Sequence, residues 1–176
     1  MLMWLKKLFN RFAISATDRE RQMKEIVYRG GLVTFAIPAN WIEEYGDDGG
    51  GIFFEDYRDS GTLRLNVLTF ESNEQSDNID VDTLVKEKAK ERGGIAIVLD
   101  EGNALVRYDE QSIENGEQIT LRYWSVYNPV PPNHVRVAVF SYTLLSSQFT
   151  KSRYVKELEM LDREIAKIRF ATSLGK

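Results

Sequence analysis

The stretch LVRYDEQSIENGEQITLRYWSVY, residues 105–127, contains the strongest turn signal in the chain. Asn115 and Gly116 both tolerate the positive φ angles of a type I′ turn, and β-branched and aromatic residues lie on either side. The stretch therefore predicts a β-hairpin. Because Glu114 and Glu117 flank the turn, the sequence leaves the register of the two strands open.

Alternating apolar residues on both sides of this hairpin predict further strands. Apolar side chains at every second position place one face of a strand in the core. Pro38 ends the first run because proline cannot donate a hydrogen bond to the sheet. The short apolar run 95–99 is expected to be a buried strand. Since most connections between the strands are short, the pattern favours an α+β fold with one large antiparallel sheet. The alternating runs are Val33-Phe35-Ile37, Leu63-Leu65-Val67 and Val135-Val137-Val139.

Two segments have apolar residues at helical spacing. The first begins at Asp80, whose carboxylate can accept from first-turn amides, and ends at Gly93-Gly94, which permits a left-handed stop. The second covers about residues 151–170. Its apolar stripe is too short for a coiled-coil seam, so packing on the sheet is expected. The two stripes are Val81, Leu84, Val85 and Ala89, and Tyr154, Leu158, Leu161, Ile165 and Ile168.

The N-terminal residues 1–12 also have helical spacing. Lysines interrupt the apolar run, so we expect a retained segment and not an export signal. The segment can dock on its own domain, lie on an anionic membrane surface, or pack into a groove of a partner. We assign residues 1–24 to an N-terminal amphipathic helix and linker, and residues 25–172 to a single α+β domain. The predicted apolar face holds Trp4, Leu5, Leu8, Phe9 and Phe12, and the polar face holds Lys6, Lys7, Asn10 and Arg11.

The composition indicates a globular protein with one domain. The chain has 176 residues, of which 43% are apolar and 28% are charged. The absence of cysteine excludes disulfides and thiolate sites and is compatible with a cytoplasmic location. A net charge of −4 gives no basic excess for nucleic acid, so we expect no nucleic-acid partner. No apolar stretch approaches the roughly 20 residues of a membrane-spanning helix.

Known catalytic and metal-binding motifs do not fit this sequence. The single histidine, His134, has no neighbouring nucleophile or second imidazole, and residues 49–51 lack the Lys-Ser/Thr of a phosphate-binding loop. Acidic residues are densest over residues 43–59, but their spacing is not that of a calcium loop. We therefore predict no catalytic, cofactor-binding or metal-binding residue. Charged loops of this kind can recognise a basic partner, and Asp47 and Asp48 are the candidates.

The stretch LVTFAIPANW, residues 32–41, resembles the opening of PsbP-like domains, in which an apolar strand is followed by Ile-Pro-x-x-Trp. A glycine-rich turn and the strands at 51–54 and 62–67 follow in the order found in such domains. The resemblance implies a central antiparallel β-sheet flanked by helices in an α/β/α sandwich. That fold is shared by the extrinsic photosystem II protein, a Ran-binding nuclear import factor, DcrB-like proteins and bacterial effector chaperones. It transfers no functional residue to a position of this chain.

Together, the resemblance and the missing motifs favour a non-enzymatic protein-binding module, such as an adaptor, chaperone or immunity protein of a bacterial secretion system. The alternatives are a carboxylate-dependent hydrolase and a peripheral membrane protein anchored by residues 1–12. Three of the candidate partner contacts, Tyr123, Trp124 and Tyr127, are aromatic residues on a predicted strand. Strand aromatics also fill cores, so core packing is the alternative to partner binding for these three. Oligomeric state is left open. The candidate partner contacts are Trp4, Leu8, Phe9, Phe12, Asp47, Asp48, Tyr123, Trp124 and Tyr127.

Overall fold

A computed structural model describes residues 22–47, 49–71 and 79–172, which form ten strands, two α-helices and two short 3-10 helices. The strands are β1 (Met23–Tyr28), β2 (Val33–Pro38), β3 (Trp41–Tyr45), β4 (Gly51–Glu55), β5 (Thr62–Glu71), β6 (Ile95–Val98), β7 (Ala104–Glu114), β8 (Glu117–Val130), β9 (His134–Leu145) and β10 (Arg169–Phe170). The helices are α2 (Val81–Arg92), α3 (Ser152–Ile165), η3 (Arg29–Gly31) and η4 (Asp100–Gly102).

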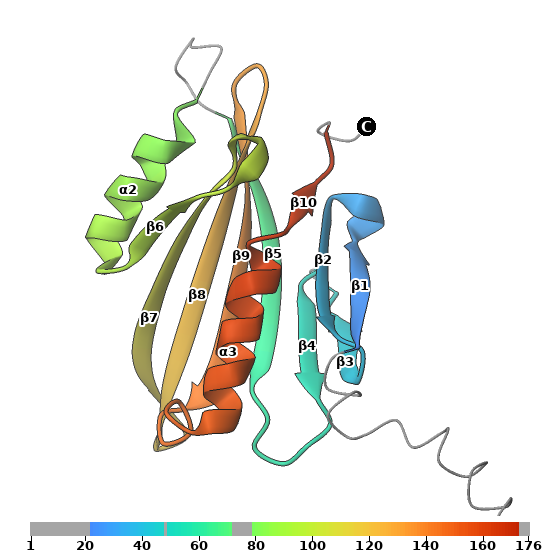
Figure 1. Ribbon diagram of the computed structural model, residues 1–176, viewed down its shortest axis with the longest axis vertical. Helices are drawn as coiled ribbons and strands as arrows, with labels where there is room; N and C mark the ends of the chain where they lie inside the picture. Colours follow the sequence, from blue (N-terminus) through green and yellow to red (C-terminus); the bar gives the residue numbers. More distant parts are fainter. Residues whose placement is uncertain (1–21, 48, 72–78, 173–176) are drawn as a thin grey trace, which may run out of the picture.

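The strands form two antiparallel sheets, which lie side by side in Figure 1. The larger sheet has the strand order β3-β4-β5-β9-β8-β7-β6, and the smaller has the order β1-β2-β10. The expected α+β class with a large antiparallel sheet is therefore confirmed. The sequence suggested a single sheet, whereas the structure places β1, β2 and β10 in a sheet of their own.

The hairpin of β7 and β8 lies toward the β6 edge of the large sheet. Glu114 pairs with Glu117, so the loop holds only Asn115 and Gly116, with φ angles of 51° and 83°. Positive φ at both central residues is the signature of the type I′ turn, whose twist matches that of paired strands. The register that the sequence left open is thus set by a two-residue loop.

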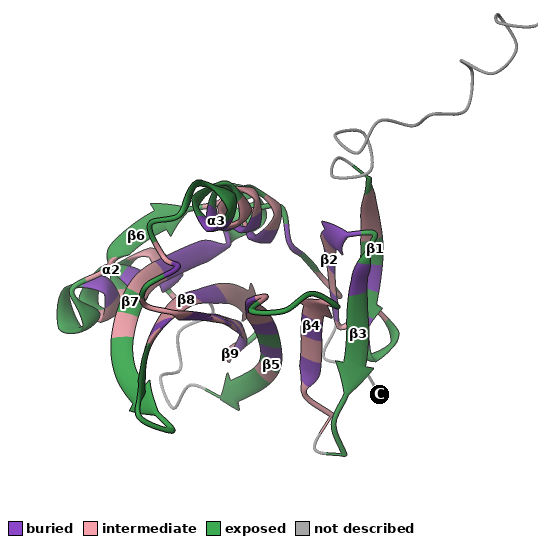
Figure 2. Cartoon of the chain, turned by 90° about the horizontal axis from the view of Figure 1, so that it is seen from below, coloured by how far each residue is buried: buried purple, intermediate pink, exposed green. Residues whose placement is uncertain are grey.

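Alternate residues of the large sheet face two different cores. On β8, Trp124 and Val126 join the larger core, where α3 and the small sheet pack (Figure 2). Tyr127 faces the other way, toward a smaller core in which Val81, Val85 and Ala89 of α2 meet β7 and β9. Neighbouring side chains of a strand point to opposite faces, so β8 and β9 supply both cores.

Both ends of α2 match the sequence prediction. The Asp80 carboxylate accepts from the backbone N–H of Thr83 at 3.1 Å, which satisfies a first-turn amide. Gly93 closes the helix in the left-handed conformation, at φ 63° and ψ 28°.

The second helix, α3, is shorter than the helix predicted from the sequence, which covered about residues 151–170. α3 ends at Ile165, and Arg169 and Phe170 instead pair with Thr34 and Val33 of β2. Ile168 is buried in the larger core as the apolar spacing implied, but from the segment between α3 and β10. Ile168 continues the apolar spacing of the helix although it lies outside the helix, which explains why the predicted helix extended too far.

The expectation that residues 95–99 form a buried strand is wrong. They form β6, but all four of its residues are exposed, including Ile95 at 45% and Val98 at 60%. β6 is the last strand of the large sheet and pairs only with β7 within the described residues. An apolar run predicts a strand, but it does not reveal whether the strand has a second neighbour.

An aspartate of α3 ties this helix to the sheet. The indole N–H of Trp124 donates to Asp162 over 2.7 Å, and the guanidinium of Arg107 donates to the other carboxylate oxygen. Trp124 is only 1% exposed, so its N–H has little access to water. Asp162 thus supplies the partner that a buried indole requires.

We predict that Asp162→Ala lowers the free energy of unfolding by about 2 kcal/mol, because it leaves a buried N–H donor and a cation without their acceptor. Glu159→Ala is the control, since Glu159 is exposed on the same helix; it should change stability by less than about 0.5 kcal/mol. Urea unfolding followed by fluorescence measures both. Equal effects of the two substitutions would contradict the role assigned to Asp162.

Candidate functional site

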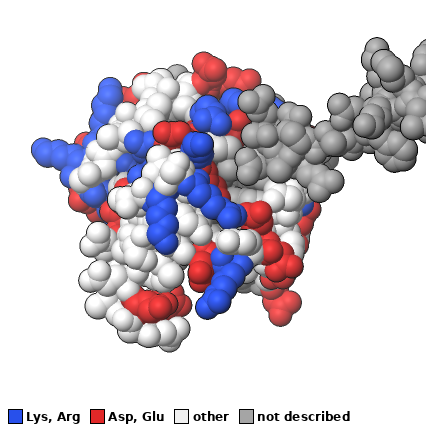
Figure 3. Space-filling view, turned by 60° about the horizontal axis from the view of Figure 1, so that its bottom comes forward, with Lys and Arg blue, Asp and Glu red and all other residues white. Residues whose placement is uncertain are grey.

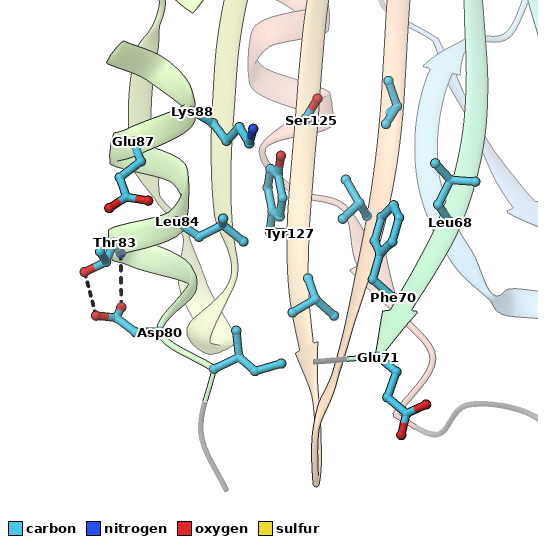
Figure 4. Close-up of a pocket in the computed structure, with 14 residues that line it drawn as sticks. Leu68, Phe70, Glu71, Asp80, Thr83, Leu84, Glu87, Lys88, Ser125 and Tyr127 are labelled. Carbon is cyan, nitrogen blue, oxygen red and sulfur yellow. Dashed lines mark hydrogen bonds between the residues drawn. The ribbon is translucent and has the colours of Figure 1, made fainter. Parts of the chain in front are cut away.

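A groove lies between α2 and β5 on the smaller-core face of the large sheet (Figure 4). We call it the α2 groove. Its volume is about 820 Å³, within the roughly 300–1,000 Å³ typical of ligand pockets. Its floor is formed by β9 and β8, one wall by α2 and the other by the end of β5. The apolar lining consists of Leu68, Phe70, Ile79, Leu84, Val135, Val137 and Val139.

The β5 wall of the groove leaves large apolar side chains in solvent. Leu68 is 50% exposed and Phe70 is 53% exposed. β4 pairs with β5 only from Thr62 to Leu65, so the rest of this edge has no strand beside it within the described residues. Exposed apolar side chains next to an apolar groove are typical of a binding surface and not of a closed core.

Polar groups occupy one side of the α2 groove. In Figure 4, Leu84 and Lys88 point from α2 toward Tyr127 and Ser125 of β8. The Lys88 ammonium pairs with the carboxylate of Glu91 at 2.8 Å, which offsets its charge. Burial raises the pKa of Tyr127, so this hydroxyl stays protonated and can donate or accept near neutral pH.

Three acids border the same groove. Glu71 ends β5, Asp80 caps α2, and Glu87 lies about two turns further along the helix. With Lys88 already paired, the lining carries a net negative charge. An occupant with basic residues beside its apolar part therefore fits this groove best.

The structure separates the three strand aromatics that the sequence proposed as contacts. Tyr127 lines the α2 groove, and Tyr123 lies on the same face, half-buried and stacked on Tyr108 with ring centroids 4.9 Å apart. Trp124 is a wrong prediction as a contact, because its side chain is buried against α3. Alternation along β8 accounts for the difference, since Trp124 points away from its two neighbours in this set.

The remaining proposed contacts are exposed or outside the described residues. Asp47 is exposed in the turn after β3. Residues 1–21 and Asp48 lie outside the described residues, so Trp4, Leu8, Phe9 and Phe12 stay predictions. On the face shown in Figure 3, acidic and basic side chains are interspersed. No helix among the described residues is long and apolar enough to span a membrane.

A second hollow, of about 560 Å³, lies between α3, β3 and the end of β4. We call it the carboxylate pocket, because Glu55 and Glu157 both line it. Glu55 accepts from the Asn40 amide at 3.0 Å and from the Arg153 guanidinium. Lys156 of α3 also borders the pocket, so cations and carboxylates meet there.

Glu157 is the most perturbed carboxyl of the described residues. Burial, and to a lesser extent the negative charge of Glu55, raise its pKa to about 7. The hydroxyl of Tyr142 donates to it, and the Tyr142 ring is fully buried and stacked parallel to Trp41. The sequence pointed to the acids of residues 43–59 but missed Glu157, because its neighbour Glu55 lies about a hundred positions away in the chain.

We predict that this carboxyl makes stability depend on pH. A raised folded-state pKa means that the protonated form is favoured by folding, so its contribution is present below about pH 4.5 and is lost as pH rises through about 7. Relative to Glu157→Gln, the wild type should lose about 3 kcal/mol between pH 4.5 and pH 8. Urea unfolding of both proteins across this range measures the difference. Parallel curves for the two proteins would contradict the assignment.

The comparisons with known proteins identify a fold. No family model and no curated protein matches this sequence. Among solved structures, the chain is similar to LpqN of Mycobacterium tuberculosis, a protein involved in cell envelope biogenesis. The TM-score is 0.58 at 15% identity, over 89% of this chain and 97% of LpqN.

Two further solved structures are similar. A protein from Bacteroides thetaiotaomicron has a TM-score of 0.56 at 14% identity over 84% of this chain, which spans only 48% of that protein. The Ran-binding protein Mog1p of Saccharomyces cerevisiae has a TM-score of 0.49 at 14% identity, over 86% of this chain and 96% of Mog1p. The expected PsbP-like fold is confirmed, and at these identities the likeness concerns the fold alone.

Proposed function

We propose that the protein is a non-enzymatic binding module whose α2 groove takes up an apolar segment of a partner protein. The supporting observation is the exposed apolar wall of β5, where Leu68 and Phe70 face solvent beside a floor of valines. Burying such side chains under a partner supplies the main driving force of association. An adaptor, chaperone or immunity protein would use a surface of this kind.

The proposed partner segment is basic as well as apolar. Glu71, Asp80 and Glu87 border the groove, whereas its one lysine is paired with Glu91. Opposite charges on the border of the groove and on the partner increase the association rate, and the acidic border disfavours acidic partners. Residues 1–12 of this chain combine the same features, so deleting them is part of the test.

We predict that a photo-cross-linking amino acid at position 70 captures one protein partner in the cells that encode this chain. The same probe at Ile113 is the matched control, because that side chain is 70% exposed at the far end of β7. Leu68→Glu should reduce the yield at position 70 about tenfold, since it places a charge on the apolar wall. Glu87→Lys should reduce it by a smaller factor, through the rim charge.

Three outcomes would contradict this function. Identical products at positions 70 and 113 would indicate non-specific capture. A co-purifying small apolar molecule without any cross-linked protein would indicate a ligand-binding role. In the third outcome, the probe captures only residues 1–12 in the full chain, and it captures no other protein once residues 1–21 are deleted. This result would indicate that the groove holds the chain's own segment.

A carboxylate-dependent hydrolase is the second candidate, and the carboxylate pocket favours it. Glu157, with its pKa near 7, and Glu55, paired with Arg153, are two acids in different environments, which is what acid–base catalysis requires. We predict that any hydrolase activity found with ester or glycoside substrates falls at least a hundredfold in Glu157→Gln. Activity that survives both Glu157→Gln and Glu55→Gln would exclude this pocket as its source.

A further inference from the structure

The edge strand β6 exposes apolar side chains on both faces of the large sheet. Ile97 is 38% exposed and lies opposite Leu105, whose side chain is in the larger core. Val98 is 60% exposed and lies opposite Ala104, which is in the smaller core. Paired residues share a face, so the strand offers apolar surface above and below its outer backbone edge, which pairs with no other strand of the described residues.

The opposite edge of the same sheet is protected by charge. β3 carries Glu43 and Glu44 in the middle of the strand, and Lys24 of β1 pairs with Glu43 at 3.2 Å. Charged side chains on an edge strand discourage another strand from pairing there. β6, with the sequence Ile-Ala-Ile-Val, has no charged residue. The two edges therefore differ in the feature that blocks strand addition.

We propose that β6 is a dimerisation edge, which pairs antiparallel with β6 of a second copy of this chain. A two-fold axis through Ile97, perpendicular to the sheet, keeps the two faces of both copies aligned. It places Ile97 opposite Ile97, Ala96 opposite Val98, and Ile95 opposite Leu99. Every cross-strand pair is then apolar, and the two sheets join into one continuous sheet.

The charges next to β6 are complementary under the same symmetry. Asp100 and Glu101 follow the strand, whereas Lys90 lies in the last turn of α2, just before it. Arg92 of the same turn pairs with Glu110 of β7 at 3.1 Å, so Lys90 is the cation that this argument uses. In an antiparallel pair the end of one strand meets the beginning of the other. The acids of each copy therefore come beside Lys90 of the other copy, which favours this orientation over a parallel one.

The short strand limits the strength of this contact. Four residues form few backbone hydrogen bonds, and small interfaces of this kind belong to transient associations. The dimer is consequently weak and depends on protein concentration. No residue of β6 lines the α2 groove, so the proposal does not rest on the groove having a partner.

Sedimentation velocity of the full chain, from low micromolar to near millimolar concentration, tests the proposal. The wild type should move from monomer to dimer across this range. Ile97→Lys should weaken dimerisation at least tenfold, because it places two like charges opposite each other at the axis. Ile113→Lys is the control, because it places the same charge on an isoleucine outside β6 that is more exposed (70% against 38% for Ile97), and it should dimerise like the wild type. Circular dichroism and thermal melts verify that each variant is folded.

A mixture of two variants gives the decisive result. Ile97→Lys and Ile97→Glu should each be mainly monomeric alone but form a heterodimer when mixed, since opposite charges then meet at the axis. A wild type that stays monomeric at every concentration would overturn the proposal. So would a dimer that Ile97→Lys leaves intact, an equal loss in Ile113→Lys, or folded variants that do not associate on mixing.

Discussion

The alternation of side chains along β8 and β9 is the constraint on which the rest of the structure depends. Trp124 and Val126 point into the core beneath α3, whereas Ser125 and Tyr127 point toward α2. A shift of one residue in register would exchange the two sets and put a tryptophan on the groove side. The two-residue loop at Asn115-Gly116 fixes β8 against β7, and so it determines indirectly which side chains line the α2 groove.

Features set by local chemistry could be predicted from the sequence. The hairpin turn and both ends of α2 follow from a few adjacent residues whose backbone preferences are strong. Features that depend on distant neighbours were missed. The segment after Ile165 was predicted as helix because Ile168 continues the apolar spacing, yet Phe170 finds a strand partner in Val33, far earlier in the chain. β6 was predicted correctly as a strand, but its position at the edge is a property of the whole sheet.

The candidate site was harder to predict than the fold, for the same reason. Leu68 and Phe70 alternate like core residues, and only the placement of α2 against β6 and β7 shows that nothing covers them in the described structure. Tyr127 was named from its residue type, and it does line the groove. Trp124 was named on the same grounds and is buried, because residue type does not distinguish the two faces of a strand. Glu157 gave no signal at all, since its perturbation arises from burial and from Glu55.

The two faces of the large sheet are covered by other elements to different degrees. Beneath α3, apolar residues from both sheets pack together, and the buried indole N–H of Trp124 has its acceptor in Asp162. On the other face α2 buries only a short stripe and leaves Leu68 and Phe70 in solvent. Surfaces that bind must remain open in the free protein, so their stability has to come from elsewhere in the fold. The closed α3 face supplies it. The larger core holds the strands in place, while the α2 face leaves apolar side chains in solvent. Apolar surface exposed in this way carries a risk of aggregation, so a partner that covers it would also lower that risk.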